Sequence, residues 1–190
     1  MRKLVYYVGT SLDGFIAGPE HQVDFYPLSD DMAAWINDRY PETVPSHLRE
    51  HAGLTEAPNL RFDTVVMGLG TYRPALDAGI TRPYRHLREV VVSSSLTDAD
   101  PAVEVVAHDV VARVRELKAE ESEHDVWLCG GGRLAGSLLP EIDEIVLKRY
   151  PVVAGSGIPV IDGPFRPTEF RPTDSIAFDN GALVTWFARA

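Results

Sequence analysis

Short apolar runs alternate along the chain with amphipathic segments, a pattern typical of α/β proteins. Each of the first five runs holds four to six residues with few polar positions, as expected for strands buried on both faces of a parallel sheet. They are Lys3–Val8, Thr64–Met67, Glu89–Val92, Val103–Val106 and Asp125–Cys129, and a sixth run is Glu144–Lys148.

Amphipathic patterns between these runs predict helices. One is Asp30–Asn37, which Ser29 is expected to cap. A second is Asp109–Glu120, with Asp109 itself as the expected cap. A third, shorter helix over Arg133–Leu139 begins directly after three glycines.

The last part of the chain changes from this alternation to a hairpin pattern. Thr168–Phe178 and Ala182–Ala188 flank Asp179-Asn180-Gly181, which is a strong turn signal. The sequence therefore predicts one α/β domain over residues 1–190, with three layers and a mostly parallel central sheet that ends in an antiparallel hairpin. Leu12–Pro27 and Pro41–Asn59 are predicted as long irregular segments, which are often functional.

Composition and charge narrow the classes of partner. Hydrophobic residues make up 45% and charged residues 24% of the chain, which excludes a disordered or fibrous protein. The net charge of −10 disfavours nucleic acid, because an acidic surface repels phosphate backbones. No apolar run approaches membrane length, and the single cysteine, Cys129, fits a reducing compartment. We expect a cytoplasmic protein without membrane or nucleic-acid partners.

Two glycine-rich turns follow predicted strands. Gly130–Gly132 begins the loose dinucleotide pattern G-x-G-x-x-A, and Gly68–Thr71 has the same position after an earlier strand, with Thr71 as the expected helix cap. Backbone amides at such turns can hold a pyrophosphate, although a tight turn without a ligand is the plainer alternative. Carboxyl ends of parallel strands meet at one sheet edge, so both turns are expected beside the same ligand.

Hydroxyl groups mark the end of a third strand, at Ser93-Ser94-Ser95. An ordinary loop that binds no ligand would explain such a run of serines. At this edge of the sheet, however, serine hydroxyls would also suit a ribose or a 2′-phosphate.

The segment His47-Leu48-Arg49-Glu50-His51 matches the inverted zinc-peptidase motif H-x-x-E-H. On a helix, the two histidines would share one face. The segment is bounded by Pro45 and Gly53 and lacks a convincing third ligand, so we favour a solvated helical turn and expect no metal. Zinc at His47 and His51 is the alternative to be tested.

Two aspartates are candidate proton carriers. Asp13 lies in Ser11-Leu12-Asp13-Gly14, and Asp31 lies at the start of a predicted helix. Either could face the ligand as a carboxylate of raised pKa. Alternatively, Asp13 caps a turn and Asp31 complements a helix dipole, and spacing alone does not decide between these roles.

The order of these motifs resembles that of the dihydrofolate reductase-like superfamily, and most closely the family shared with the reductase domain of bacterial riboflavin biosynthesis. The resemblance covers nearly the whole chain. It rests on five segments: Ser11–Ala17, Val66–Tyr72, Val91–Ser95, Cys129–Leu134 and Gly155–Pro159.

The resemblance implies that NADPH lies along the carboxyl edge of the sheet. Gly9, Ile16 and Ala17 would face the nicotinamide, and Ser93 and Ser94 would lie near the adenosine ribose. The other implied cofactor-binding residues are Gly68, Leu69, Thr71, Gly130, Gly131, Gly132, Arg133 and Leu134. Leu69 and Gly70 stand where dihydrofolate reductases usually carry a basic residue for the 2′-phosphate, so NADH is an alternative cofactor.

The implied reaction is hydride transfer to a C=N or C=O carbon of a small heterocyclic or sugar-like substrate, of the pterin or pyrimidine type. No arginine stands where the glutamate of dihydrofolate would be gripped, so dihydrofolate itself is not expected. Asp31 or Asp13 would carry the proton, and the resemblance also implies a homodimer. The alternative is a nucleotide-binding protein that keeps this fold without the reaction.

Overall fold

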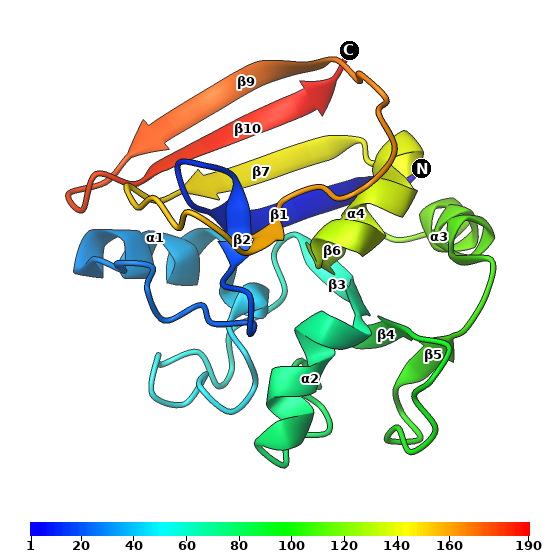
Figure 1. The fold of residues 1–190 in the computed structure, drawn as a ribbon. Coiled ribbons are helices and arrows are strands. Elements are labelled where there is room, and N and C mark those ends of the chain that lie inside the picture. Colours follow the sequence, from blue (N-terminus) through cyan, green and yellow to red (C-terminus); the bar gives the residue numbers. More distant parts are fainter.

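The apolar runs form the centre of one eight-stranded sheet in the computed structural model, which describes residues 1–190 (Figure 1). The strand order is β5-β4-β3-β6-β1-β7-β10-β9, with the six strands from β5 to β7 parallel and the last two antiparallel. The strands are β1 (Leu4–Thr10), β3 (Phe62–Gly68), β4 (Arg88–Val92), β5 (Glu104–Val106), β6 (Asp125–Gly130), β7 (Glu144–Arg149), β9 (Phe170–Ala177) and β10 (Leu183–Arg189). The six predicted strands and the terminal hairpin are confirmed.

Four α-helices cover the two faces of the sheet. They are α1 (Asp30–Arg39), α2 (Leu69–Asp77), α3 (Val110–Ala119) and α4 (Gly132–Leu138), and two short 3₁₀ helices are η1 (Pro41–Thr43) and η2 (Leu139–Glu141). Met32 of α1 and Tyr72 of α2 belong to the core on one face, and Leu117 of α3 and Leu138 of α4 belong to the core on the other. The three-layer prediction is thus confirmed. No helix is both long and apolar enough to cross a membrane.

Side-chain alternation along β1 divides the core between the two faces. Val5 and Tyr7 point into the core beneath α1, whereas Leu4, Tyr6 and Val8 point into the core beneath α3 and α4. Both sets are almost fully buried, as expected for a strand that has neighbours on each side and helices above and below.

The helix caps differ from the sequence prediction. Ser29 and Asp109 occupy the N-cap positions of α1 and α3, but neither side chain bonds a helix amide. The Ser29 hydroxyl donates instead to Asp31, and Asp109 has a left-handed backbone with φ of 54°. Thr71 is not a cap, because α2 begins two residues earlier with Gly68 as its N-cap.

A small second sheet crosses the end of the main one. It pairs β2 (Phe15–Ala17) with β8 (Ile158–Pro159), antiparallel. We call this pair the β2–β8 ribbon. The sequence prediction treated Leu12–Pro27 as irregular, and the ribbon was missed because a strand of two or three residues is too short for a period of two to be visible.

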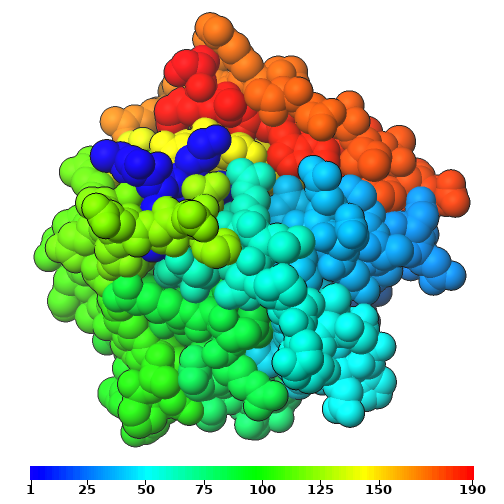
Figure 2. Space-filling view, turned by 180° about the vertical axis from the view of Figure 1, so that it is seen from behind, coloured from blue at the N-terminus to red at the C-terminus, as the bar shows by residue number.

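The segment after α1 is held to the sheet by a buried carboxylate. Glu42 is fully buried and accepts hydrogen bonds from the backbone amides of Leu60, Arg61 and Phe62, at 3.3, 2.9 and 2.9 Å. The nearly buried Arg49 donates to the carbonyls of Pro41 and Ala57. Figure 2 shows this part of the chain, in light blue and cyan, as a continuous surface beside the orange and red C-terminal hairpin.

We expect Glu42→Gln to lower the free energy of unfolding by about 2 kcal/mol, because an amide group cannot accept from all three backbone donors and leaves buried N–H groups unpaired. Urea denaturation measures this change. Glu50→Gln is the matched control, since Glu50 is exposed and is expected to change stability by less than about 0.5 kcal/mol. Equal stabilities of the two variants would contradict the anchoring role of Glu42.

Candidate functional site

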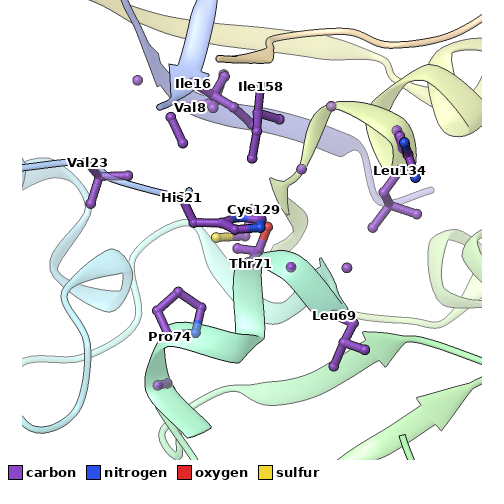
Figure 3. A pocket seen from close by; sticks show the side chains of 18 of the residues that line it. Val8, Ile16, His21, Val23, Leu69, Thr71, Pro74, Cys129, Leu134 and Ile158 are labelled. Carbon is purple, nitrogen blue, oxygen red and sulfur yellow. The ribbon is translucent and has the colours of Figure 1, made fainter. Parts of the chain in front are cut away.

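A cavity of about 1380 Å³ opens where the parallel strands end. It is bordered by the end of β1 at Gly9, of β3 at Gly68, of β6 at Cys129 and of β7 at Lys148. Figure 3 shows Ile16 and Ile158 of the β2–β8 ribbon along one wall and Thr71 and Pro74 of α2 along the opposite wall. The cavity therefore lies at the carboxyl edge of the sheet, where open α/β sheets bind ligands.

The two glycine turns meet in this cavity. A Cβ atom placed on Gly68 would lie 3.7 Å from the Gly130 carbonyl oxygen, and one placed on Gly131 would lie 3.6 Å from the Thr71 hydroxyl. The Gly130–Gly131 peptide bond is cis. The first amides of α2 and α4 have no acceptor within their own helices, so they are available to a ligand at this edge. The predicted juxtaposition of the two turns is confirmed.

Close backbone contacts fix the β2–β8 ribbon above these turns. A Cβ atom on Gly132 would lie 2.1 Å from the Pro159 carbonyl oxygen, and one on Gly157 would lie 2.1 Å from the Ala17 carbonyl oxygen. Gly157 also has φ of 154°, which L side chains rarely adopt. Only glycine fits at either position, so the ribbon and the first turn of α4 share one rigid arrangement.

Most of the residues predicted to bind cofactor line the cavity. They are Gly9, Ile16, Ala17, Gly68, Leu69, Thr71, Gly131, Gly132, Arg133 and Leu134. Gly130, Ser93 and Ser94 are not part of the lining, although Val92 is. The Ser93 hydroxyl accepts hydrogen bonds from the amides of Ser95 and Leu96, both at 3.1 Å, so it shapes its own turn. A ribose contact at Ser93 and Ser94 stays a prediction.

The two candidate proton carriers, Asp13 and Asp31, lie outside the cavity lining and are exposed. Asp13 accepts hydrogen bonds from the Ser11 hydroxyl and from the amides of Ala154 and Gly155, and these bonds lower its pKa to about 2. Ser29 and the Asp179 amide donate to Asp31 and lower its pKa as well. Both carboxylates hold loops together, which favours the structural alternative for each.

Sequence reasoning missed the aromatic part of the cavity wall. Its walls include the aromatic side chains of Tyr26, Tyr84 and Tyr150, and Lys148 of β7 is the cation among them. The Lys148 ammonium lies 3.8 Å from the centre of the Tyr7 ring. Burial lowers the pKa of Lys148 to about 8. Lys148 ends an apolar strand, so its sequence context resembled an ordinary strand terminus.

Tyr84 reaches the cavity from the loop before β4. Its amide donates to the Glu89 carboxylate at 2.7 Å, and Glu89 is fully buried and paired with Arg82 at 2.7 Å. The Tyr84 ring packs edge-on against Trp127, with centroids 5.0 Å apart. Cys129 shares this wall, and burial raises the pKa of its thiol to about 12, which favours inert packing over thiolate reactivity.

The H-x-x-E-H segment lacks the helix on which the zinc alternative depends. His47 and His51 lie in a series of turns, and no cluster of three His, Cys, Asp or Glu side chains suitable for a metal exists in the molecule. Arg49 within the segment donates hydrogen bonds to the carbonyls of Pro41 and Ala57 and so stabilises the turns. These observations favour the structural turn, and zinc at His47 and His51 stays an alternative to be tested by elemental analysis of the purified protein.

Comparisons with known proteins agree with this architecture. The family model described as the RibD C-terminal domain matches residues 2–184. Two proteins of Bacillus subtilis (strain 168), the uncharacterized YwjB and YyaP, are 27% and 22% identical, covering 90% and 96% of this chain and 88% and 92% of their own.

Two solved structures share the fold. A putative riboflavin biosynthesis protein from Shewanella sp. PV-4 has a TM-score of 0.71 and 22% identity, with 100% of this chain and 99% of that chain covered. A diaminohydroxyphosphoribosylaminopyrimidine deaminase/5-amino-6-(5-phosphoribosylamino)uracil reductase from Thermotoga maritima has a TM-score of 0.65 and 16% identity, with 100% of this chain and 57% of that chain covered. The dihydrofolate reductase-like α/β fold is confirmed.

We expect the Asp13 carboxyl group to titrate with a midpoint at about pH 2 in a ¹³C NMR titration, because its three donors favour the ionised form. The folded-state pKa lies below the ordinary value of about 3.9. The contact with Ala154 and Gly155 therefore stabilises the fold above that ordinary value and is lost as the pH falls through about 2. A midpoint at or above about 4 would show that these bonds are absent in solution.

Proposed function

The chain belongs to the RibD C-terminal domain family, and we propose that it is an NAD(P)H-dependent reductase that transfers a hydride to a C=N or C=O carbon of a small substrate. The observation that carries this proposal is the meeting of two glycine turns at the ends of the neighbouring strands β3 and β6, inside one large cavity. Such an edge combines free backbone amides with close backbone approach, which suits a pyrophosphate.

The two halves of the cavity suit the two parts of the reaction. Gly68, Thr71 and Gly131–Leu134 would hold the pyrophosphate, while Gly9, Ile16 and Ala17 would lie along the nicotinamide. The half lined by Tyr26, Tyr84 and Tyr150 would receive the substrate, since aromatic walls exclude water and pack against flat or carbonyl-bearing molecules. The bound cofactor would supply the hydride, and the protein would supply orientation and a dry pocket.

The names of the two similar structures support a reductase but do not identify the substrate of this chain. The Thermotoga maritima protein is named as a 5-amino-6-(5-phosphoribosylamino)uracil reductase in its second activity, and the Shewanella protein as a putative riboflavin biosynthesis protein. The second candidate function, nucleotide binding without turnover, is favoured by one observation: neither Asp13 nor Asp31 faces the cavity. Homodimer formation and a cytoplasmic location stay predictions.

Calorimetric titration with NADPH and then NADH tests the cofactor site. We expect micromolar binding of NADPH, and a loss of at least about tenfold in Gly131→Asp, because a carboxylate beside Thr71 and Ile16 repels the pyrophosphate. Gly131→Ala is the matched control, since its methyl group meets only ordinary contacts at 3.6 and 3.7 Å and adds no charge. If the protein binds neither NADPH nor NADH, the reductase proposal is wrong. If Gly131→Asp and Gly131→Ala bind NADPH with equal affinity, the pyrophosphate does not lie beside Gly131.

A charge at Ser94 tests the position of the adenosine end. Ser94 is exposed beyond the end of β4, so Ser94→Asp should leave the fold intact. If a 2′-phosphate lies nearby, we expect about tenfold weaker NADPH binding and less than about threefold weaker NADH binding. Ser94→Ala provides the uncharged comparison. An equal loss for the two nucleotides, or no loss for either, would place the 2′-phosphate away from Ser94.

A further inference from the structure

Lys148 differs from the other two lysines of the chain in having no carboxylate partner. Lys3 pairs with Glu144 at 3.4 Å and Lys118 pairs with Asp143 at 2.6 Å, whereas Lys148 forms no ion pair. Its side chain is half-buried in the cavity wall, and its ammonium lies over the Tyr7 ring. Even a half-buried cation is unfavourable without a counter-ion, so its presence in a ligand cavity points to a function.

The groups around Lys148 carry no negative charge at neutral pH. Its two partners in the strand register are Gly9 of β1 and Val184 of β10. Tyr7 of β1 and Cys129 of β6 also lie beside it. Tyr84 from the loop before β4 and Tyr150 directly after β7 line the same part of the cavity, and burial raises the pKa of both hydroxyl groups. His47 also lines the cavity from the segment after α1.

The cavity is accordingly positive within an acidic protein. Its only lining carboxylate, Asp162, lies beside Arg133 at 3.5 Å, near the glycine turns. Lys148 is therefore the cation left unpaired, and it stands directly across from Gly9 in the strand register. Gly9 is the residue at which the proposed function places the nicotinamide, so Lys148 adjoins the position where the acceptor carbon must lie.

We propose that Lys148 is the proton donor of the reduction and that the substrate is a carbonyl compound, aldehyde or ketone, without positive charge. This inference rests on the proposed function. An ammonium group can donate to a carbonyl oxygen and stabilise the charge that develops there. Reduction of a C=N bond through a protonated iminium is disfavoured, because the Lys148 ammonium would repel that cation.

The proton and electron changes balance in one step. The carbonyl carbon accepts the hydride with its electron pair from the reduced nicotinamide, and the π pair of the C=O bond moves to oxygen. The oxygen takes a proton as one N–H bond of the Lys148 ammonium breaks. The products are an alcohol, the oxidised nicotinamide and a neutral lysine amine, which regains a proton from water at the open cavity. The pKa of about 8 places this donor close to neutral pH, as acid catalysis requires.

The small number of lysines allows Lys148 to be observed directly. With ¹⁵N-labelled lysine, the protein should show three Nζ resonances, and Lys148→Met identifies the one that disappears. We expect that resonance to titrate near pH 8, both in the free protein and with saturating NADP⁺. A midpoint near the ordinary value of about 10.4 in the free protein overturns the proposal. A rise to that value with NADP⁺ but not with NAD⁺ would assign Lys148 to the 2′-phosphate and also overturns it.

Kinetics with defined acceptors test the step itself. NADPH oxidation would be followed with 4-nitrobenzaldehyde, phenylglyoxylate and 7,8-dihydropterin, between pH 6 and pH 10. We expect reduction of the carbonyl compounds, with kcat constant at low pH and falling tenfold for each pH unit above about 8, as Lys148 loses its proton. Lys148→Met should lower kcat at least about 100-fold and leave NADPH affinity unchanged, and Lys148→Arg should remove the fall at high pH. Lys3→Met, outside the cavity, is the control that should behave as wild type.

The outcomes separate this proposal from the reductase proposal. NADPH binding with unchanged carbonyl reduction in Lys148→Met, or with a change in KM alone, overturns the donor role only. Reduction of the dihydropterin but of neither carbonyl compound, or of no acceptor by a protein that binds NADPH, overturns the substrate class. Failure to bind either nucleotide overturns the reductase function and this inference together.

Discussion

The cavity depends on the close packing of the β2–β8 ribbon against the first turn of α4. Gly132 and Gly157 allow carbonyl oxygens of Pro159 and Ala17 to approach to a distance that no side chain would permit. The amide of Asp162 donates to the Gly132 carbonyl at 3.0 Å and secures the same contact. Because the ribbon forms one wall and the glycine turns form another, this packing sets the width of the site before any ligand arrives.

Charge is distributed unevenly between the surface and the cavity. The chain carries −10 overall, yet the cavity is lined by an unpaired lysine, an arginine beside a single aspartate, and two histidines. A negative exterior with a locally positive pocket disfavours nucleic acid as a partner while it accommodates a small anionic cofactor. The aromatic ring beneath Lys148 partly replaces the missing counter-ion through its negative face.

The sequence was sufficient for the parts of the fold that repeat a local pattern. The buried strands, the amphipathic helices, the Asp179–Gly181 hairpin and the meeting of the two glycine turns follow from periodicity and from the geometry of parallel sheets. It failed where a side chain's role depends on distant partners. Asp13 and Asp31 have the side chain of an acid catalyst, and their sequence context does not exclude that role. Each accepts a hydrogen bond from a backbone amide far along the chain, that of Ala154 for Asp13 and that of Asp179 for Asp31.

Lys148 was missed for the same reason. Its importance lies in what surrounds it, because Tyr7 and Gly9 come from a strand about 140 positions earlier and no carboxylate reaches it. The absence of a partner is a property of the folded molecule and leaves no mark in the sequence. The one signal present was the scarcity of lysine, since only three occur in the chain and the other two pair with acids beside them in space.

One cavity at the strand ends is proposed to bind a dinucleotide with its nicotinamide beside Gly9. A crystal structure of the protein with NADP⁺ tests this most directly. We expect a nucleotide extended across the cavity, with its pyrophosphate against Gly131–Arg133 and its nicotinamide along Gly9, Ile16 and Ala17. A nucleotide bound outside this cavity, or bound with its nicotinamide directed toward Ser94, would contradict it.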